Sequence, residues 1–597
     1  MSRSVTKVVF FAVLLSISIT ALALVAVSFT SYAVVNGAVE SLRLSSTHRA
    51  GLFSRTAYER IIFNLRCSAF GAFLAAALIF RLRKNTENFI RATFEDFLRF
   101  GAELYRRAVQ FVHGDVLDAS VLLSLCVEGL ALRLWYLFQP VRFDEAFTYL
   151  YYARKPAVVG MSFYSAPNNH VFYTVLVHFA VLLFGNHPWV IRLPALTSGI
   201  LLLPCSYGTF RRLYGREAAL LTVTFLATSA ALVEYSTNAR GYMGICLCFV
   251  ILVWLGEELL RTESLSRWMC FVGVAAVGFY TIPIMLYPFA MVVVWLVICA
   301  WRLRLRTGFF LRLLSASVAA LLSAAILYLP VLVVSGRSAL FSNRFVQSRS
   351  WPYFLSNILQ SFAATWKSWN AAIPQPLAIA LLVAFIGGAI LERRTLRAPA
   401  SLLAGLVSIS LLLVGQRVVP FERVWLFLIP LYFGVACTGI VMAARALQQS
   451  VGVRETHGIS IAAILVSVGL SASLMITNVI YATNEGKDSE AITELLKGRL
   501  KTGDRVIVEL PYDVPLEYYF DKHMVPTDFL FCDPKVSDEL FVVSPIGHAP
   551  ESVLNEIGEP VGTGLRSPEL IKRFTDTNLF EVGRLKTAAA VRNQGDN

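Results

Sequence analysis

The sequence predicts a polytopic α-helical membrane protein that carries a small soluble α/β domain near its C-terminal end. Apolar runs of roughly 17 to 25 residues, long enough for a helix to cross a bilayer, recur along most of the chain. Of the 597 residues, 56% are apolar and only 15% are charged, whereas a soluble chain carries about 25% charged residues. The third observation is a change of charge and patterning near Glu485, where the apolar runs end.

The net charge of +14 conceals two regions of opposite sign. From Glu485 onward, 13 Lys and Arg stand against 20 Asp and Glu, a net of −7, and the remainder carries 40 against 19, a net of +21. The basic excess is therefore a signal of membrane topology and not a nucleic-acid footprint, and the acidic tail is a separate soluble module. Eight of the nine Cys precede the tail in or beside apolar runs, and none has metal-binding spacing.

The apolar runs predict about 13 membrane spans, with end points that are soft by several residues. The first run is too long for the core of a signal peptide, so it is predicted to stay as a signal anchor. The basic segment 81–107, between the second and third spans, has the Phe, Leu and Ile spacing of an amphipathic helix on a membrane surface. The predicted spans are 8–34, 61–80, 118–138, 190–210, 217–234, 242–259, 267–281, 284–301, 311–335, 373–391, 399–415, 421–442 and 459–481.

The distribution of basic residues predicts the orientation. Arg3 and Lys7 precede the first span and favour a cytoplasmic N-terminus. Segment 169–185 is apolar but short and contains two His. If it crossed the membrane, the basic turn 211–217 would lie outside. We therefore expect an interfacial helix on the outer surface, which makes this turn and the later basic loops cytoplasmic and places the tail outside the cytoplasm.

The tail, from about residue 485, alternates helix and strand signals. Residues 489–500 (SEAITELLKGRL) predict a helix, and residues 505–510 (RVIVEL) and 539–545 (ELFVVSP) predict short buried strands. The tail carries no catalytic motif. The sequence therefore predicts a small α/β domain of unassigned role.

Two adjacent acids, Asp144 and Glu145, follow the third span in VRFDEAFTYLYYARK. Carboxylates beside a membrane are costly unless they face water, a cation or a reaction. Arginine binds phosphate through a planar fork, and a carboxylate can act as a general base. The predicted topology brings further polar residues to the same face, namely Arg192, Arg240, Arg417, Arg423, Asn168, Asn169, His170, Tyr242 and Tyr280.

Each of these residues also has a simpler interpretation. A lone interfacial Arg commonly anchors a span by extending to the membrane surface. Asp144 and Glu145 could instead cap a helix or pair with Arg142 and Arg154. From the residues alone, the sequence predicts an external, interfacial, anion-binding site with a candidate base, and it does not give sugar chemistry.

The order of several segments resembles a known family. FDEAFTY, PNNHVFYT, FGNHPWVIRLPAL, RRLYGREAALL and YSTNARGYMG, within about residues 117–300, resemble the GT-C superfamily of membrane glycosyltransferases. They are most similar to its family 39 branch of protein O-mannosyltransferases and lipid A aminoarabinose transferases. FERVWLFLIPLY is similar to a later family segment, with Val424 in place of the usual Tyr. Family members often have H-P-P-L-Y or K-P-P-L-Y where this chain has NNHVFY. The first two spans, within residues 8–80, precede the point where the family's sequences usually begin.

The resemblance implies a GT-C fold and an inverting transfer of a sugar from a polyprenyl-phosphate donor to a hydroxyl of a lipid, glycan or protein. It implies that Asp144 is the base, with Glu145 beside it, and that Arg192 and Arg240 contact the donor phosphate. We add Arg423 and Arg417 to this phosphate site and assign the Asn, His and Tyr residues to substrate binding. The implied domains are an N-terminal transmembrane hairpin (1–81), a cytoplasmic amphipathic segment (82–116), a GT-C core (117–482) with external loop 139–189, and an extracytoplasmic α/β domain (483–597).

No cofactor is assigned, and a single divalent cation shared with the donor phosphate is left open, because two adjacent acids form no multi-carboxylate cage. The expected partners are the lipid-linked donor, the acceptor and membrane lipids, and no nucleic acid. The competing hypotheses are a non-catalytic transporter or flippase and a glycan-binding membrane protein. A transporter places ionisable residues on broken helices near the bilayer midplane, whereas these charges lie at span ends. The expected location is the inner or plasma membrane.

Overall fold

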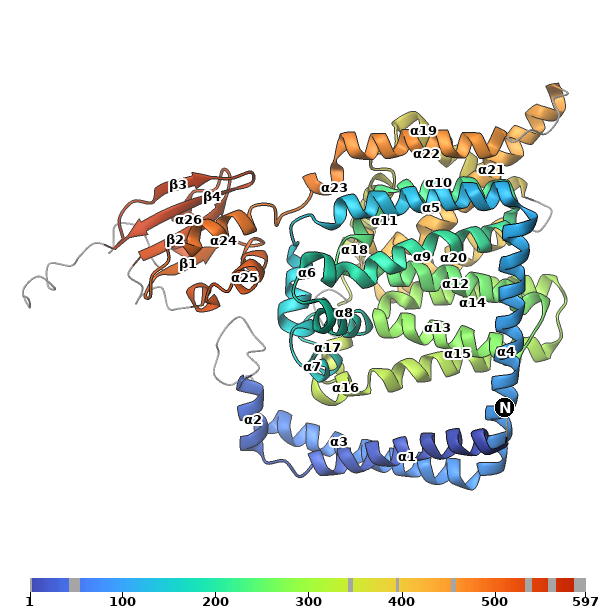
Figure 1. Cartoon of the computed structure of the whole chain (residues 1–597), viewed down its shortest axis with the longest axis horizontal. Coiled ribbons are helices and arrows are strands. Elements are labelled where there is room, and N and C mark those ends of the chain that lie inside the picture. Colours follow the sequence, from blue (N-terminus) through green and yellow to red (C-terminus); the bar gives the residue numbers. More distant parts are fainter. Residues whose placement is uncertain are drawn as a thin grey trace, which may run out of the picture.

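The computed structural model describes residues 3–41, 54–341, 347–392, 397–451, 458–531, 539–556 and 565–584. Figure 1 shows a bundle of long, roughly parallel helices with a small α/β domain beside one end. We call this end of the bundle the site end. The opposite end, where helix α4 (Arg83–Gly114) crosses the bundle, is called the α4 end. The predicted fold class is confirmed.

The predicted spans correspond to helices of the bundle. Among the described residues, nine helices are long and apolar enough to cross a membrane, or ten if the bent pair α10–α11 is one span. Helices α13 and α19 are apolar but have only 17 residues each. The helices that correspond to the predicted spans are α1 (Arg3–Val27), α3 (Arg55–Arg81), α5 (Val116–Leu137), α9 (Pro188–Tyr214), α10 (Arg216–Thr228), α11 (Ala230–Ser236), α12 (Tyr242–Arg261), α13 (Leu265–Thr281), α14 (Leu286–Arg302), α15 (Thr307–Leu327), α19 (Gln375–Leu391), α20 (Arg397–Gln416), α21 (Ile429–Val451) and α22 (Gly458–Thr477).

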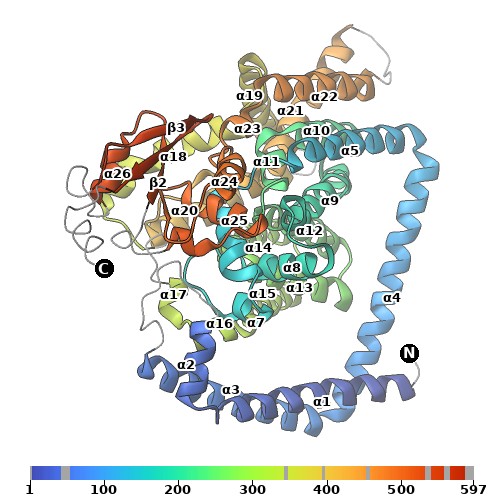
Figure 2. The ribbon, with the colours of Figure 1, turned by 60° about the vertical axis from the view of Figure 1, so that its left-hand side comes forward.

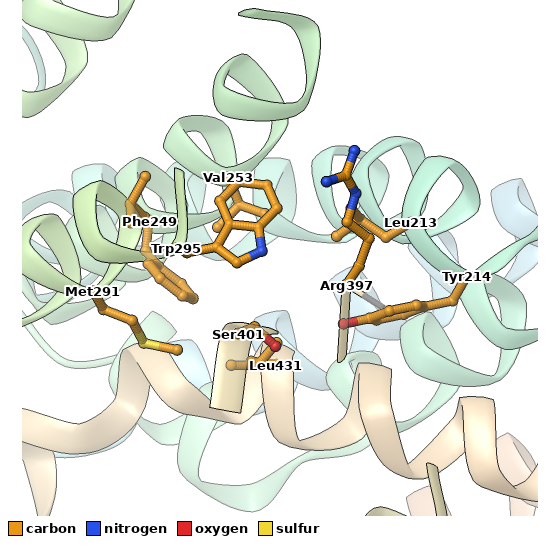
Figure 3. Close-up of a pocket in the computed structure, with 10 residues that line it drawn as sticks. Leu213, Tyr214, Phe249, Val253, Met291, Trp295, Arg397, Ser401 and Leu431 are labelled. Atoms are coloured by element: carbon orange, nitrogen blue, oxygen red, sulfur yellow. The ribbon is translucent and has the colours of Figure 1, made fainter. Parts of the chain in front are cut away.

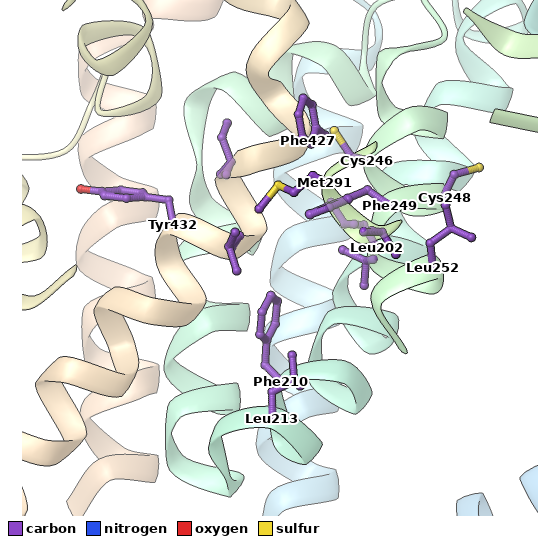
Figure 4. Close-up of a cluster of buried hydrophobic side chains, with 14 of the residues drawn as sticks. Leu202, Phe210, Leu213, Cys246, Cys248, Phe249, Leu252, Met291, Phe427 and Tyr432 are labelled. Carbon is purple, nitrogen blue, oxygen red and sulfur yellow. The ribbon is translucent and has the colours of Figure 1, made fainter. Parts of the chain in front are cut away.

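The core of the bundle lies among α9, α12, α14 and α21. Phe210, Phe249 and Met291 are among its buried side chains (Figure 4). Helices α19 and α21 approach each other closely at Gly388 and Gly439, where a Cβ on either glycine would overlap the backbone of the other helix. Small residues allow such close crossings in membranes, where packing rather than water exclusion drives helix association.

The N-terminal hairpin of α1 and α3, with helix α2 (Tyr32–Ser41) following α1, lies along one side of the bundle (Figures 1 and 2). It contacts the short helix α16 (Leu329–Val334), where Arg60 on α3 donates to the carbonyl of Val334 at 3.2 Å. Helix α4 runs at a steep angle to the other helices and connects the hairpin to the α4 end. Glu103 on α4 pairs with Arg267 at 2.7 Å, and Arg107 pairs with Glu258 at 3.0 Å. The predicted amphipathic segment is therefore one continuous helix fixed to the bundle by ion pairs.

Short helices gather at the site end. The predicted interfacial segment forms helix α8 (Val171–Phe184), which rises only about 21 Å. His170, just before α8, contacts Arg240, and Asn186, just after it, contacts Asp521 of the α/β domain. Both ends of α8 thus lie at the site end, and α8 does not traverse the bundle. The other short helices are α6 (Phe143–Thr148), η1 (Tyr149–Ala153), α7 (Ala157–Ser162), η2 (Pro283–Met285), α16 (Leu329–Val334), α17 (Arg337–Phe341), α18 (Trp351–Trp369), η3 (Glu422–Leu428) and α23 (Val479–Ala482).

The α/β domain contains a four-stranded sheet of order β1-β2-β4-β3. Strands β1 and β2 are parallel, and the other neighbouring pairs are antiparallel. Strand β2 is buried on both faces, with Leu540 and Val542 in one cluster and Phe541 and Val543 in another, as the two-residue period of a strand requires. The elements are α24 (Ser489–Lys497), β1 (Arg505–Val508), α25 (Asp513–Lys522), η4 (Thr527–Leu530), β2 (Glu539–Pro545), α26 (Pro550–Glu556), β3 (Glu569–Arg573) and β4 (Thr577–Gly583).

Candidate active site

Helix α6 carries the two adjacent acids at the site end. It begins after Arg142, which is extended, and the Glu145 carboxylate accepts the Arg142 backbone N–H at 2.9 Å. This contact satisfies one of the N–H groups that the start of a helix leaves unpaired. Consecutive residues on a helix point about 100° apart, so Asp144 and Glu145 face different surroundings.

Glu145 lies in a saturated and fully buried ion pair. Its carboxylate accepts two hydrogen bonds from Arg192, both at 2.7 Å, and the Ala239 N–H at 2.6 Å. Neither side chain of the pair is exposed. Glu145 therefore joins α6 to α9 and to the segment that precedes α12.

Arg192 uses its remaining N–H groups within the protein. It donates to the carbonyl oxygens of Leu137, Gln139 and Pro140, at 2.6, 2.7 and 3.0 Å. Together with the two bonds to Glu145, these contacts occupy all five N–H donors of a guanidinium. Arg192 thus caps the carbonyls at the end of α5, and none of its donors is available to a phosphate in this arrangement.

Asp144 has a different environment. Its Oδ1 accepts a hydrogen bond from Asn168 at 2.8 Å, and its Oδ2 lies 3.4 Å from Arg423 and 3.9 Å from Arg240. The side chain is 26% exposed. Burial alone would raise the pKa of Asp144, but Arg240, Arg423 and Asn168 outweigh it and hold that pKa below its ordinary value. Asp144 is therefore an ionised carboxylate with access to the outside of the protein.

Arg240 and Arg423 each have a buried Nε that no described residue accepts from. Arg240 is otherwise well held, because its Nη1 donates to Thr148 and to the carbonyl of Asn168 at 3.0 and 2.9 Å. A buried N–H without an acceptor costs free energy. The two unpaired N–H groups beside Asp144 indicate where an oxygen-rich anion would be stabilised.

His170 lies beside Arg240 at one side of the cluster of Asp144, Arg240 and Arg423, and its imidazole ring is neutral. Its Nδ1 accepts the Gly241 N–H at 2.9 Å, and its Nε2 lies 3.1 Å from Arg240. Burial, Arg240 and Arg423 all lower the pKa of His170, which falls well below its ordinary value. Tyr242 meets the His170 ring edge-on at 5.1 Å and lies under the Arg240 guanidinium at 5.9 Å.

The other predicted residues have different contacts. Asn169 is buried and shapes the loop before α8, because its amide donates to the carbonyls of Gly160 and Phe163. Arg417 stacks over the Trp351 ring at 5.6 Å. Tyr280 packs against the ring of Tyr328. The structure thus groups the following predicted residues around one point: Asp144, Asn168, His170, Arg240, Tyr242 and Arg423.

The sequence interpretation missed Arg133, which holds the helix break that leads to the site. Helices α10 and α11 meet at 60°. Arg133 is fully buried and donates to Ser236 at 3.0 Å and to the carbonyl of Ala227, freed by the break, at 3.1 Å. Helix α11 then leads into Ala239 and Arg240. An Arg inside an apolar span is itself a functional signal, and this signal in segment 118–138 could have identified Arg133.

An apolar pocket lies near the α4 end, between α9, α12, α14, α20 and α21 (Figure 3). Met291, Trp295 and Leu431 line it, together with Leu213. Leu213 lies about 32 Å along α9 from Arg192, so this pocket is separate from the candidate site. Among the described residues, no group of three or more His, Cys, Asp and Glu is placed to hold a metal ion.

The site end of the helical bundle thus carries an ionised carboxylate beside two arginines, and arginines are suited to binding an anionic group. Residues 170–333 match the family model described as dolichyl-phosphate-mannose-protein mannosyltransferase. The matched segment contains helices α8 to α15 and includes Arg192 and Arg240 of the site end.

Solved structures are similar to this chain at low sequence identity. The crystal structure of ArnT from Cupriavidus metallidurans in the apo state is 15% identical, and the match covers 79% of this chain and 98% of that chain, with a TM-score of 0.49. The same protein bound to undecaprenyl phosphate is 16% identical, with the same coverage and a TM-score of 0.48. The archaeal oligosaccharyltransferase AglB from Archaeoglobus fulgidus, in complex with an inhibitory peptide and a dolichol phosphate, is 11% identical over 71% of this chain and 69% of that chain, with a TM-score of 0.39. A comparison with curated proteins finds no match.

Proposed function

We propose that this protein transfers a sugar from a polyprenyl-phosphate donor to a hydroxyl group, with inversion at the anomeric carbon. The observation that carries the proposal is the cluster of Asp144, Arg240 and Arg423. It combines an ionised carboxylate with two guanidinium groups that each retain an unpaired buried N–H. The family match suggests the sugar chemistry, because dolichyl-phosphate-mannose-protein mannosyltransferases take a dolichyl-phosphate sugar as donor.

In the proposed reaction, the acceptor oxygen attacks the anomeric carbon while the bond from that carbon to the donor phosphate breaks. The hydroxyl proton moves to Oδ2 of Asp144, because Oδ1 is occupied by Asn168. The bonding electrons leave with the phosphate, and Arg240 and Arg423 stabilise its charge. The products are the glycoside and polyprenyl phosphate.

The two arginines also link donor binding to the strength of the base. In the described arrangement they hold the pKa of Asp144 low, and a carboxylate with a low pKa is a weak base. A bound phosphate would compensate their charge and so raise the pKa of Asp144. The base would therefore become stronger once the donor is in place.

Glu145 and Arg192 are positioning residues in this proposal. The sequence analysis assigned them to catalysis and to phosphate binding. Their mutual pair is fully buried, and every Arg192 donor is used. Their role is to hold the start of α6 against the end of α5, which sets the position of Asp144.

We place the site on the extracytoplasmic face of the inner or plasma membrane. Basic segments such as 301–312 and 211–217 end or join helices at the α4 end, and basic loops are retained in the cytoplasm. The lipid-phosphate donor then lies with its headgroup at the level of Arg240 and Arg423. The acceptor, whether lipid, glycan or protein, approaches from the side on which the α/β domain lies.

A transporter is the competing proposal, and the break between α10 and α11 is the observation that favours it. Transporters place ionisable residues at such breaks to bind their cargo. Arg133 occupies this break, but it donates to Gly129, Ala227 and Ser236 within the protein. The break is thus closed by the protein itself, which favours the enzyme.

Single substitutions test the role of Asp144 as base separately from the role of Arg240 and Arg423 as phosphate ligands. The Asp144→Asn variant should lower transfer by about 10²- to 10⁴-fold and should still bind undecaprenyl phosphate. Arg240→Gln and Arg423→Gln should weaken undecaprenyl phosphate binding, measured by native mass spectrometry of purified protein. Transfer is measured by mass spectrometry of glycolipids and glycoproteins in a deletion strain complemented with each variant. Normal transfer by Asp144→Asn would contradict the base assignment.

A further inference from the structure

The α/β domain is seated on the loop that carries Asp144. Val514, Tyr518 and Tyr519 of α25 are buried in the same apolar cluster as residues of α6 and η1. The ring of Tyr518 meets the ring of Tyr149 edge-on at 5.4 Å. Helix α25 therefore completes the apolar core of this loop.

Polar contacts fix α25 to the loop on both sides of Asp144. The Tyr519 hydroxyl accepts the backbone N–H of Val141 at 3.1 Å. Beyond Asp144, Tyr151 donates to Glu517 at 2.6 Å, and Arg154 pairs with Asp521 at 2.7 Å. We call this set of interactions the α25 contact.

The segment that joins the bundle to α24 contributes a further contact. Glu485 accepts the backbone N–H of Phe143 at 3.2 Å. Asn484 donates to the carbonyl of Pro140 at 2.8 Å. Gly486 lies so close to the loop that a Cβ there would overlap the carbonyl of Val141.

The consequence concerns the first turn of α6. The start of a helix leaves its first N–H groups without intrahelical partners. Just before α6 the N–H of Val141 donates to Tyr519, and at the start of the helix the N–H of Arg142 donates to Glu145 and that of Phe143 to Glu485. Two of these three acceptors come from the C-terminal part of the chain, and Asp144 is the next residue.

We propose that Tyr519 and Glu485 are positioning residues for the base, and that the α/β domain is thereby part of the active-site scaffold. This inference rests on the proposed function, because it gives Asp144 the role of base. The loop 141–154 has α6 and η1 as its only helical turns, and such short turns hold their geometry only through tertiary contacts. Tyr519 and Glu485 supply two of the contacts that decide where α6 begins, and hence where the Asp144 carboxylate lies relative to Arg240 and Arg423.

The charges of α25 are complementary to those of the loop that it contacts. Asp513, Glu517 and Asp521 are spaced four residues apart and so share one face of the helix, where like charges repel each other. Arg154 and Lys155 follow η1 and interact electrostatically with this acidic face. The loop thus supplies the cations that the acidic face of α25 requires.

Two neighbouring tyrosines provide a matched pair of variants. The Tyr519→Phe variant removes the acceptor of the Val141 N–H and leaves that buried donor unpaired. Tyr518→Phe removes a buried hydroxyl for which the described residues offer no hydrogen-bond partner. Each change removes one hydroxyl oxygen from a buried tyrosine. The two variants therefore differ mainly in that only Tyr519→Phe breaks a hydrogen bond of the α25 contact.

The test uses the full-length protein in nanodiscs and has two readouts. Tyr519→Phe and Glu485→Ala should speed hydrogen exchange in peptides covering 139–147 and should lower kcat for transfer about tenfold or more. Their KM for the lipid donor should be unchanged, because Arg240 and Arg423 are not altered. Tyr518→Phe should leave both readouts at the wild-type level.

The two readouts distinguish failure of this inference from failure of the proposed function. Unchanged exchange in Tyr519→Phe and Glu485→Ala would overturn the α25 contact, whatever the protein does. Faster exchange with a normal kcat would overturn the positioning role. Loss of undecaprenyl phosphate binding in either variant would also contradict it, because the phosphate site would then depend on the same contact. Absence of transfer by the wild-type protein would overturn the proposed function while the exchange result still decides the contact.

Discussion

At the scale of single residues, the adjacent acids Asp144 and Glu145 carry the same functional group but differ in burial, and this difference gives the two carboxylates different roles. Glu145 accepts four hydrogen bonds and has no contact with solvent. Asp144 retains an open oxygen and faces two guanidinium groups. The first arrangement is suited to holding structure and the second to moving a proton.

Glu145→Ala and Asp144→Asn should therefore have opposite effects on stability and activity. The Glu145→Ala variant leaves the Arg192 cation buried and unpaired, which costs about 3–5 kcal/mol, so its thermal unfolding in detergent should shift down strongly. Asp144→Asn removes a partly exposed charge next to two cations, and its unfolding should change little while transfer is lost. A stable Glu145→Ala protein would contradict the structural role of the pair.

The residue scale also shows what a sequence can and cannot predict. Asp144, Arg240 and Arg423 could be predicted as candidates because charges at the ends of apolar runs are conspicuous. The saturation of Arg192 depends on the carbonyls of Leu137, Gln139 and Pro140, and a carbonyl has no sequence signature. The role of Arg192 could therefore not be predicted from its residue type.

At the scale of elements, the break between α10 and α11 determines how the chain reaches Arg240. The break frees carbonyls in an apolar environment, where an unsatisfied backbone group is costly. Arg133 satisfies the carbonyl of Ala227 and is anchored by Ser236. Gly199 leaves room for this arrangement, because a Cβ there would overlap Ser236.

The Arg133→Met variant should destabilise the bundle and displace Arg240. It keeps most of the apolar stem but leaves the freed carbonyls without donors, at a cost of about 1–3 kcal/mol for each buried unpaired group. We expect a lower unfolding temperature and weaker binding of undecaprenyl phosphate. Arg133→Lys, which retains a donor, should recover part of both losses, and an equal loss in the two variants would contradict the capping role.

Helix α25 is the element that the sequence analysis missed and that matters most to the site. Its segment DVPLEYYFDK contains Pro515 and two adjacent tyrosines, and its apolar residues do not show one clear helical face because both its own domain and loop 141–154 bury it. Helix α24 and strands β1 and β2 were predicted because each has a single regular pattern. An element buried against two partners loses that pattern.

The α25 contact should weaken as the pH rises through neutrality. Burial and the neighbouring carboxylates of Asp513 and Asp521 raise the pKa of Glu517 to about 7, against the contributions of Tyr151 and Lys155. The docked state therefore binds a proton more tightly than the undocked state, so its stabilisation is complete below about pH 4.5 and is lost as the pH rises to about 7.

Hydrogen exchange of peptides covering 141–154 should accordingly become faster between pH 5 and 8, after correction for the intrinsic pH dependence of exchange. Glu517→Gln, which stays neutral and retains an acceptor for Tyr151, should remove this dependence. The exposed Glu569 on β3 offers a control, since Glu569→Gln should leave the dependence intact. An unchanged profile in Glu517→Gln would assign the titration to another group.

At the scale of the whole molecule, the charged groups divide between the two ends of the bundle. The α4 end holds ion pairs such as Glu103 with Arg267 and Glu257 with Arg397, and the site end holds Asp144 and the α/β domain. The order of the helices could be predicted because apolar length is a local property, but of the 13 predicted spans only nine or ten are long and apolar enough to cross a membrane among the described residues. The position of the hairpin α1–α3 could not be predicted, because it depends on the long helix α4 (Figure 2) and on individual contacts such as that of Arg60 with the Val334 carbonyl.

The orientation of these two ends in the membrane is a prediction that cysteine labelling checks. With native Cys532 changed to Ser, a cysteine at exposed Lys501 of the α/β domain should react with a membrane-impermeant thiol reagent in spheroplasts. A cysteine at exposed Arg106 on α4 should react only after the membrane is opened, because basic segments are retained in the cytoplasm. Both positions are exposed within the protein, so the membrane is the barrier that distinguishes them. The reverse labelling pattern would place Asp144 in the cytoplasm, where the lipid-linked donor would have to present its sugar to the opposite face.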